Sequence, residues 1–190
     1  KTPIQSSYLI DTADFVACHN SSYVTRYAVL ESLKEGGTFL LNSPWTLEDM
    51  EKHLPASMKQ EIAKKNVQFY NIDGNKIARE VGLGNRINMC LQAAFFKISG
   101  VIPEADAVEY MKQAVKKTYG KKGDEIVRMN CEAIDVAISK VEKIDYPASW
   151  ATATTGAEVV SVTDDPYFNE VIKPITAQQG DKLPVSVFDP

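Results

Sequence analysis

The first forty residues combine short apolar runs with a pattern typical of a helix. The apolar runs at 8–10 and at Asp14–Cys18 predict a buried strand or a pair of strands. The next segment predicts a helix over Ser22–Lys34, which Gly36 and Gly37 would end. The bulky residues at helical spacing in this segment are Tyr23, Tyr27, Leu30 and Leu33.

The alternation of strand and helix patterns continues to residue 72. Thr38–Leu41 predicts a strand, and Thr46 followed by Asp49 is an imperfect capping box that predicts the start of a helix. A second helix over Ala56–Lys65 leads to a strand at Val67–Ile72. Strands separated by helices pair in parallel through crossover connections. We therefore predict an α/β fold of three α/β/α layers with a mainly parallel sheet.

Everything beyond Asp73 follows a helical pattern. Asp73 is placed to cap a helix that runs to Val81. The segment Asn85–Ser99 is apolar on most faces, which is typical of a helix buried by its neighbours, and Gly100 ends it. Two amphipathic helices follow, the first opening at Pro103. The second carries an apolar stripe at Val127, Cys131, Ile134, Ile138 and Val141. We expect a helix-rich second half.

The pattern stops after Tyr146. Proline becomes frequent, Ala151–Thr155 is rich in threonine, and a short helix broken at Pro174 is the only element expected over Asp165–Gln179. We therefore predict an α/β domain over residues 1–145 and an interdomain connector over residues 146–190. Because the chain opens on Lys1 and almost directly on an apolar segment, we also expect it to be a piece of a longer protein.

Charge and cysteine content restrict the function. The 190 residues carry 21 Lys and Arg against 25 Asp and Glu, a net charge of −4, so nucleic acid and anionic membranes are not expected partners. No apolar stretch approaches the roughly 20 residues of a membrane span. The three cysteines, Cys18, Cys90 and Cys131, are odd in number and widely spaced, which favours a reducing compartment, the cytoplasm.

Most residues with reactive side chains have a structural interpretation. Cys18 and His19 are adjacent on a predicted strand, where they point to opposite faces and cannot form a dyad, so Cys18 is interpreted as a core residue. His53 follows the pattern of a helix end, where its charge complements the dipole. With two histidines and scattered cysteines, we predict no catalytic residue, metal ligand or iron–sulfur cluster in this chain.

Two glycine-containing segments also match known binding loops poorly. Asn71–Asn75 has its glycine in the wrong position for a calcium loop, so we interpret it as a turn and helix cap. Gly82–Ile87 lacks the third glycine of a dinucleotide fingerprint and follows a helix instead of a strand.

A polar stripe on the apolar helix after residue 85 is the one candidate binding site. It consists of Asn85, Asn88 and Gln92, with Arg86 at the start of the helix. One interpretation is structural, with the amides buried and engaged in capping and loop contacts. In the other, the helix N-terminus and Arg86 bind an anionic ligand. The residues alone leave both interpretations open.

Five segments, in order and spacing, resemble the pyruvate:ferredoxin (flavodoxin) oxidoreductases. They are Gly36–Trp45, Val81–Met89, Ala94–Lys97, Tyr119–Gly123 and Gln179–Ser186. The resemblance covers nearly the whole chain and points to the central, gamma-type domain of that multidomain enzyme and the start of the linker after it. The resemblance implies that this domain opens with a Gly-rich strand–loop–helix, which we expect to precede Lys1 and so to lie outside the present sequence.

The resemblance implies oxidative decarboxylation of pyruvate to acetyl-CoA, with electrons passed to ferredoxin or flavodoxin. It implies thiamine diphosphate, Mg and [4Fe–4S] clusters as cofactors of the parent enzyme, CoA as a substrate, and a homodimeric parent. The chain lacks the Gly-Asp-Gly diphosphate–metal motif and the cysteine runs of the clusters.

We therefore expect a fragment that is inactive alone and packs against other domains of the same enzyme. Asn85, Arg86 and Asn88 would lie near the route of CoA. A structural interaction module and a stand-alone nucleotide-binding α/β protein remain the alternatives.

Overall fold

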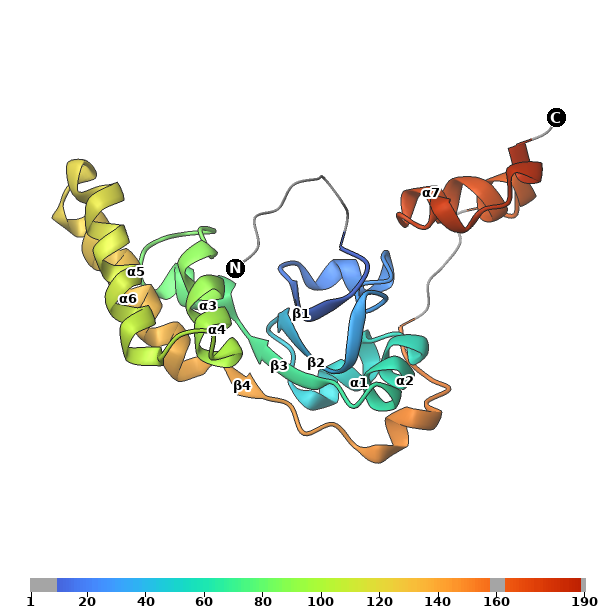
Figure 1. The fold of residues 1–190 in the computed structure, drawn as a ribbon, viewed down its shortest axis with the longest axis horizontal. Helices are drawn as coiled ribbons and strands as arrows, with labels where there is room; N and C mark the ends of the chain where they lie inside the picture. Colours follow the sequence, from blue (N-terminus) through green and yellow to red (C-terminus); the bar gives the residue numbers. More distant parts are fainter. Residues whose placement is uncertain (1–9, 158–162, 189–190) are drawn as a thin grey trace, which may run out of the picture.

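A four-stranded sheet lies at the centre of the structure, in the order β1-β2-β3-β4 (Figure 1). The computed structural model describes residues 10–157 and 163–188. Strands β1 (Ala13–Cys18), β2 (Leu33–Asn42) and β3 (Gln68–Ile72) are parallel, and the short β4 (Glu142–Lys143) pairs antiparallel with β3. The mainly parallel sheet confirms the predicted α/β class.

Side chains of the two central strands alternate between two hydrophobic cores. On β2, Phe39 and Leu41 enter one core whereas Leu40 enters the other, and all three are at most 1% exposed. On β3, Phe69 lies in the same core as Phe39, and the two rings stack with centroids 5.3 Å apart. Ile72 lies in the opposite core with Leu40. Burial on both faces explains why the inner part of β2, Phe39–Leu41, is a continuous apolar run.

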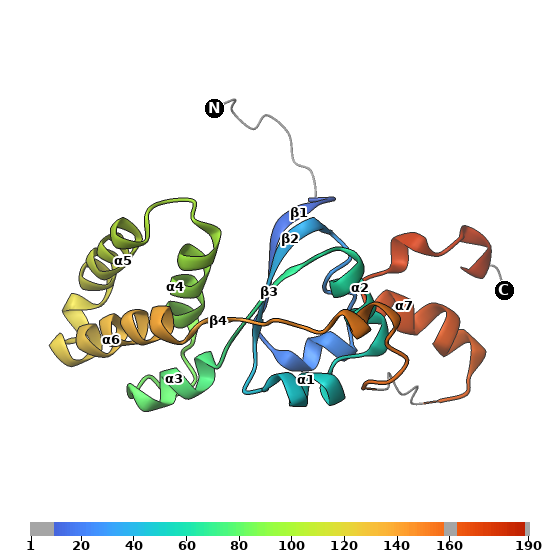
Figure 2. The same ribbon diagram turned by 90° about the horizontal axis from the view of Figure 1, so that it is seen from below.

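Helices cover both faces of the sheet and give the three layers visible in Figure 2. On one side lie α1 (Leu47–His53) and α2 (Ala56–Lys64), whose Met50, Leu54 and Ile62 are fully buried beside Phe39. Thr46 caps α1 in the predicted capping box with Asp49. The predicted helix over Ala56–Lys65 is confirmed by α2.

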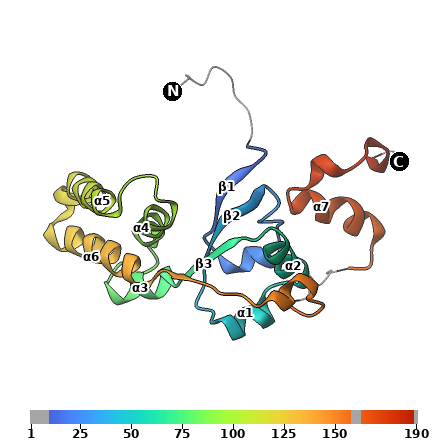
Figure 3. The ribbon, with the colours of Figure 1, turned by 60° about the horizontal axis from the view of Figure 1, so that its bottom comes forward.

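The other side carries a four-helix unit, as Figure 3 shows. It consists of α3 (Gly74–Glu80), α4 (Asn88–Ser99), α5 (Glu104–Tyr119) and α6 (Asp124–Lys140). Helix α4 contacts β2, and α6 packs against α3, α4 and α5. Small buried residues on α4 and α6 allow this close packing, namely Ala93, Ala94, Ala133 and Ala137. None of the helices within the described residues is long and apolar enough to cross a membrane.

The predicted helix over Ser22–Lys34 is wrong. A 3₁₀ helix (Ser21–Thr25) and successive turns occupy this stretch, and β2 already begins at Leu33 and runs through Gly36 and Gly37. The turns bury Val24 and Leu30 and leave Tyr23 41% exposed. Parallel pairing of Leu33 with Ala13 outweighs the local helical spacing.

Three other expectations need correction. The expected strand residues 8 and 9 lie outside the described residues, and Ile10 is 78% exposed and not in a strand. The second half is helix-rich as expected, but it also contains the short strand β4, which the pattern beyond Asp73 did not predict. Helix α4 begins at Asn88 instead of Asn85, because residues 82–87 form turns closed by bonds such as that from the Arg86 N–H to the Leu83 carbonyl.

The chain after β4 forms a strap along α2. Ile144 extends the sheet by donating its N–H to the Phe69 carbonyl (2.8 Å), and the Tyr146 hydroxyl donates to the Val67 carbonyl (3.0 Å). Trp150 is 1% exposed and stacks on the Tyr146 ring at 5.4 Å. Gln60 on α2 donates to the Ala153 carbonyl at 2.7 Å. Residues 144–157, which we call the strap, are thus packed on the body, whereas the domain boundary at 145 stays a prediction.

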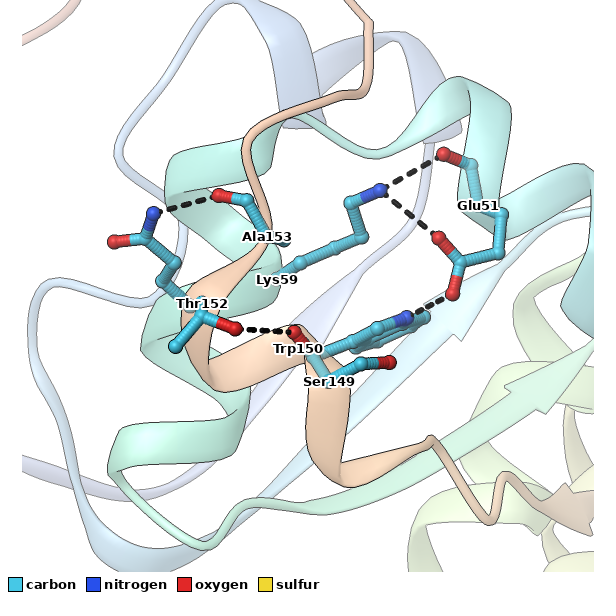
Figure 4. Close-up of polar contacts among 7 residues, drawn as sticks. Glu51, Lys59, Ser149, Trp150, Thr152 and Ala153 are labelled. Atoms are coloured by element: carbon cyan, nitrogen blue, oxygen red, sulfur yellow. Dashed lines mark hydrogen bonds and ion pairs between the residues drawn. The ribbon is translucent and has the colours of Figure 1, made fainter.

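A buried charge fixes the strap, as Figure 4 shows. The Lys59 side chain is 1% exposed, and its Nζ donates to the Glu51 carboxylate (3.0 Å) and to the Glu51 backbone carbonyl (2.9 Å). Trp150 donates its Nε1–H to the other oxygen of the same carboxylate. The bond from Trp150, and secondarily Lys59, lowers the pKa of Glu51 below its ordinary value. One carboxylate therefore joins α1, α2 and the strap.

The last described segment, residues 163–188, lies apart from the sheet (Figure 1). It contains a π-helical turn over Phe168–Ile172 that continues into α7 (Lys173–Thr176), and short 3₁₀ turns follow. The helix expected to break at Pro174 instead continues through it to Thr176, and the π-helical residues precede this proline, which has no N–H to donate to the preceding turn. We call residues 163–188 the tail.

Replacing Glu51 tests the buried charge. In Glu51→Ala, the Lys59 ammonium stays buried with only a backbone acceptor, so we expect the free energy of unfolding to fall by about 3 kcal/mol. Glu61→Ala removes the partner of Lys65, a more exposed i,i+4 pair, and should cost less than about 1 kcal/mol. Urea unfolding of both variants provides the measurement. Equal losses would mean that the pair of Lys59 with Glu51 does not fix the strap.

Gly156 provides a second test, because the strap passes very close to the turn between α1 and α2. A Cβ on Gly156 would lie 2.2 Å from the Leu54 carbonyl oxygen, so we expect Gly156→Ala to lower stability by about 1–3 kcal/mol. It should also speed hydrogen exchange at Ala157, whose N–H donates to Leu54. Gly120→Ala is the control, since its Cβ meets open space at a helical φ of −53°. A neutral Gly156→Ala would contradict this packing.

Candidate functional site

The parallel strands bring three polar loops to one edge of the sheet. Cys18, Asn42 and Ile72 end β1, β2 and β3, so the residues after them share the carboxyl edge. In open α/β sheets this edge is where ligands bind. The carboxyl edge is therefore the candidate site, built from the loops beginning at His19, Ser43 and Asp73.

Asn42 connects the three loops. Its side chain is 2% exposed, and its Nδ2 donates to the His19 carbonyl at 2.9 Å. Its Oδ1 accepts the Gly74 N–H, also at 2.9 Å, at the start of α3. A Cβ on Gly74 would lie 3.2 Å from this oxygen and 3.7 Å from the Cβ of Ile87, so the start of α4 is also close. The Asn42 amide therefore links the residue after β1 to the start of α3, beside which the start of α4 lies.

A second buried amide shapes the loop after β2. Asn71 Oδ1 accepts the Ser43 hydroxyl at 2.8 Å, and Asn71 Nδ2 donates to the carbonyls of Ser43 (3.1 Å) and Trp45 (3.3 Å). Ser43 is 0% and Asn71 4% exposed. Trp45 then stacks on the His53 ring, with centroids 4.9 Å apart and planes inclined by 14°. Buried amides in a closed network hold this loop in one conformation.

A cleft of about 390 Å³ opens beside this loop. Its floor comes from Ser43 and Asn71, and Trp45 contributes an aromatic wall. Its rim carries opposite charges, supplied by Asp73, Lys76, Glu80, Lys140 and Glu142. Three carboxylates against two ammonium groups give it no excess of positive charge.

The structure places the predicted polar stripe in the solvent. Asn85, Asn88 and Gln92 are all exposed, so the expectation of buried amides is wrong. Asn85 and Arg86 lie in the turn before α4, and Ile87 occupies the N-cap position without a side-chain cap. The stripe projects outward because α4 turns its small residues, not its amides, toward α6. None of the three proposed ligand residues lines the cleft.

Arg86 nevertheless has a defined position. Its Nε–H donates to the Leu83 carbonyl at 3.1 Å, which anchors the base of the guanidinium beside the first turn of α4. The Ile87 and Cys90 side chains on that turn lie next to Gly74 at the carboxyl edge. An exposed cation, two exposed amides and the N–H groups of a 12-residue helix therefore adjoin the edge of the sheet.

The cysteines and histidines do not converge. The Cys18 thiol is buried and donates to the Asn20 carbonyl (3.1 Å), whereas His19 is exposed, which confirms that they form no dyad. Burial raises the pKa of Cys18 and raises that of Cys90 to about 11. Across residues 10–157 and 163–188, no group of three or more His, Cys, Asp or Glu side chains could hold a metal ion.

Asn42, Ser43 and Asn71 are the residues of this edge that the sequence analysis missed. Their places in the sequence could have indicated them, because Asn42 and Ser43 directly follow an apolar run that predicts a buried strand, and Asn71 lies within another such run. Polar residues that are buried at strand ends need partners, and parallel strand ends supply them. A search for amides at such positions would have found them.

Comparison with known proteins identifies relatives of this chain. The family described as pyruvate ferredoxin/flavodoxin oxidoreductase matches residues 1–140. The pyruvate:ferredoxin oxidoreductase of Moorella thermoacetica is 56% identical over 191 residues, which cover 100% of this chain and 16% of that protein. The pyruvate-flavodoxin oxidoreductase of Klebsiella pneumoniae is 45% identical and covers 98% of this chain and 16% of its own.

A relative with another printed activity matches equally widely. The pyruvate dehydrogenase [NADP(+)] of Euglena gracilis is 42% identical over 99% of this chain and 10% of its own length. Among solved structures, the pyruvate oxidoreductase subunit PORC of Thermotoga maritima has a TM-score of 0.56 at 19% identity, covering 72% of this chain and 67% of that one. This likeness supports the fold.

The chain spans about a sixth of the first two relatives, so it corresponds to one part of a much larger enzyme. The match over residues 1–140, together with these identities, shows that the chain belongs to the pyruvate ferredoxin/flavodoxin oxidoreductase family.

Proposed function

We propose that this chain is a scaffold domain of an enzyme that oxidatively decarboxylates pyruvate to acetyl-CoA and reduces ferredoxin or flavodoxin. The support is the full-length match to 16% of oxidoreductases whose printed names give pyruvate and these electron acceptors. The thiamine diphosphate, Mg and [4Fe–4S] clusters of such an enzyme belong, in this proposal, to its other domains. Those domains are the principal partners, and the parent is a cytoplasmic homodimer.

The domain's own contribution in this proposal is a surface at the start of α4 that contacts the phosphate groups of CoA. The observation that supports this is the position of that helix end, where Arg86 and the exposed amides of Asn85 and Asn88 adjoin the carboxyl edge. CoA carries phosphate groups, and helix N-terminal N–H groups with a nearby guanidinium suit such anions. The carboxyl-edge network keeps this helix end in place.

The scaffold role predicts that the isolated chain does not catalyse the conversion of pyruvate to acetyl-CoA. The 190-residue chain, supplied with pyruvate, thiamine diphosphate, Mg²⁺, CoA and an artificial electron acceptor, should show no rate above a blank without protein. The parent enzyme under the same conditions is the positive control. Steady acetyl-CoA formation by the isolated chain would contradict the proposal.

Arg86 tests the position near CoA. In the parent enzyme we expect Arg86→Ala to raise KM for CoA about tenfold, with KM for pyruvate unchanged, because a charge-assisted contact to a phosphate is lost. Arg86→Lys should recover part of the affinity.

Arg79→Ala serves as the matched control, since Arg79 is also exposed but lies at the last turn of α3. Circular dichroism of each variant separates loss of fold from loss of binding. An unchanged ratio of the two KM values in Arg86→Ala would assign Arg86 a structural role only.

A further inference from the structure

The two C-terminal segments are attached to the body by different kinds of contact. The strap is held by buried groups: Trp150 is 1% exposed, and the Lys59 ammonium that shares its carboxylate partner is equally buried. The Glu51 side chain that both groups share is 42% exposed, so the part of this attachment that added salt does not weaken is the packing of the buried Trp150 ring on Tyr146 and Phe69. The strap is therefore a fixed part of the sheet unit.

The tail is attached through Glu31, which is exposed. Lys182 forms an ion pair with Glu31, and Gln179 Nε2 donates to Glu31 Oε2 at 3.3 Å. The side chains of Lys182 and Glu31 are 59% and 46% exposed. The bond from Lys182 lowers the pKa of Glu31, so the carboxylate is ionised near neutral pH. Exposed pairs of this kind weaken as ionic strength rises.

Apolar packing adds little to this attachment. Among the described residues, neither hydrophobic core includes a residue beyond Trp150. Val171 is buried, yet Tyr167, Ile175 and Phe188 stay about half exposed. A groove of about 800 Å³ separates the surfaces, lined by Tyr23 and Tyr27 on the body and by residues 177–179 on the tail. In Figure 1 the tail lies away from the sheet.

We infer that Glu31 is a salt-labile tether: the tail detaches from the body as a unit when this contact breaks, while the strap stays in place. In a multidomain parent, the strap would then stay on the sheet unit, and the tail and the chain after it would move relative to that unit. Detachment of the tail would expose the side of the groove that Tyr23 and Tyr27 line.

Small-angle scattering of the 190-residue chain tests the tether. Between about 0.05 and about 0.5 M NaCl the radius of gyration of the wild type should rise by about 2 Å as the pair is screened. Glu31→Gln should show the larger radius already at low salt. Exchanging the charges, as Glu31→Lys with Lys182→Glu, should restore the smaller radius and its salt dependence.

Asp14→Asn is the matched control, because it breaks another exposed pair, Lys34 with Asp14, within the body. It should leave the radius and its salt dependence as in the wild type. Hydrogen exchange at Ile144 and Ala157, whose N–H groups bond to Phe69 and Leu54, should not change when the tail detaches. An identical radius for Glu31→Gln and wild type at low salt, or exposure of both amides with added salt, would overturn the inference.

Discussion

Burial of β2 and β3 on both faces is the constraint from which the other features follow. Phe39 and Leu40 point in opposite directions and are each almost fully buried, so helices must cover both sides of the sheet. Parallel pairing then places all three strand ends at one edge. Their polar groups lose water there, and Asn42 and Asn71 replace it with hydrogen bonds to neighbouring loops. The carboxyl edge is held in one conformation because these buried amides would lose their hydrogen-bond partners if the neighbouring loops moved.

Local patterns predicted the elements whose stability is local. The Thr46–Asp49 capping box, α2 and the left-handed Gly100 at the end of α4 depend on neighbouring residues, and the sequence was sufficient for them. The stretch from Ser22 to Lys34 failed because β1 requires a partner strand, and that requirement is set by Ala13, a distant residue. Helical spacing cannot report a competing contact of this kind.

At the candidate site, too, the features that depend on neighbouring residues could be predicted and those that depend on distant residues could not. Arg86 lies beside the start of a helix, as its place in the sequence suggested, and its role near CoA stays a prediction. The burial of Asn85 and Asn88 was predicted wrongly, since the direction of α4 depends on its packing against α6. The bond between Trp150 and Glu51 joins residues 99 positions apart. Nothing in either local sequence indicates it, because both have ordinary surroundings along the chain.

The charged groups of the chain divide by burial, and that division assigns them different roles. Lys59 is buried and donates two hydrogen bonds to Glu51, so it fixes the position of the two helices and the strap relative to one another. Arg86 is exposed, and its Nε–H donates to the Leu83 carbonyl, which holds the guanidinium at the edge of the sheet. The thiols of Cys18 and Cys90 are buried with raised pKa values, so they are protonated near neutral pH and poor nucleophiles. The described residues thus supply rigid positioning and an exposed cation, the two properties that the proposed role near CoA requires.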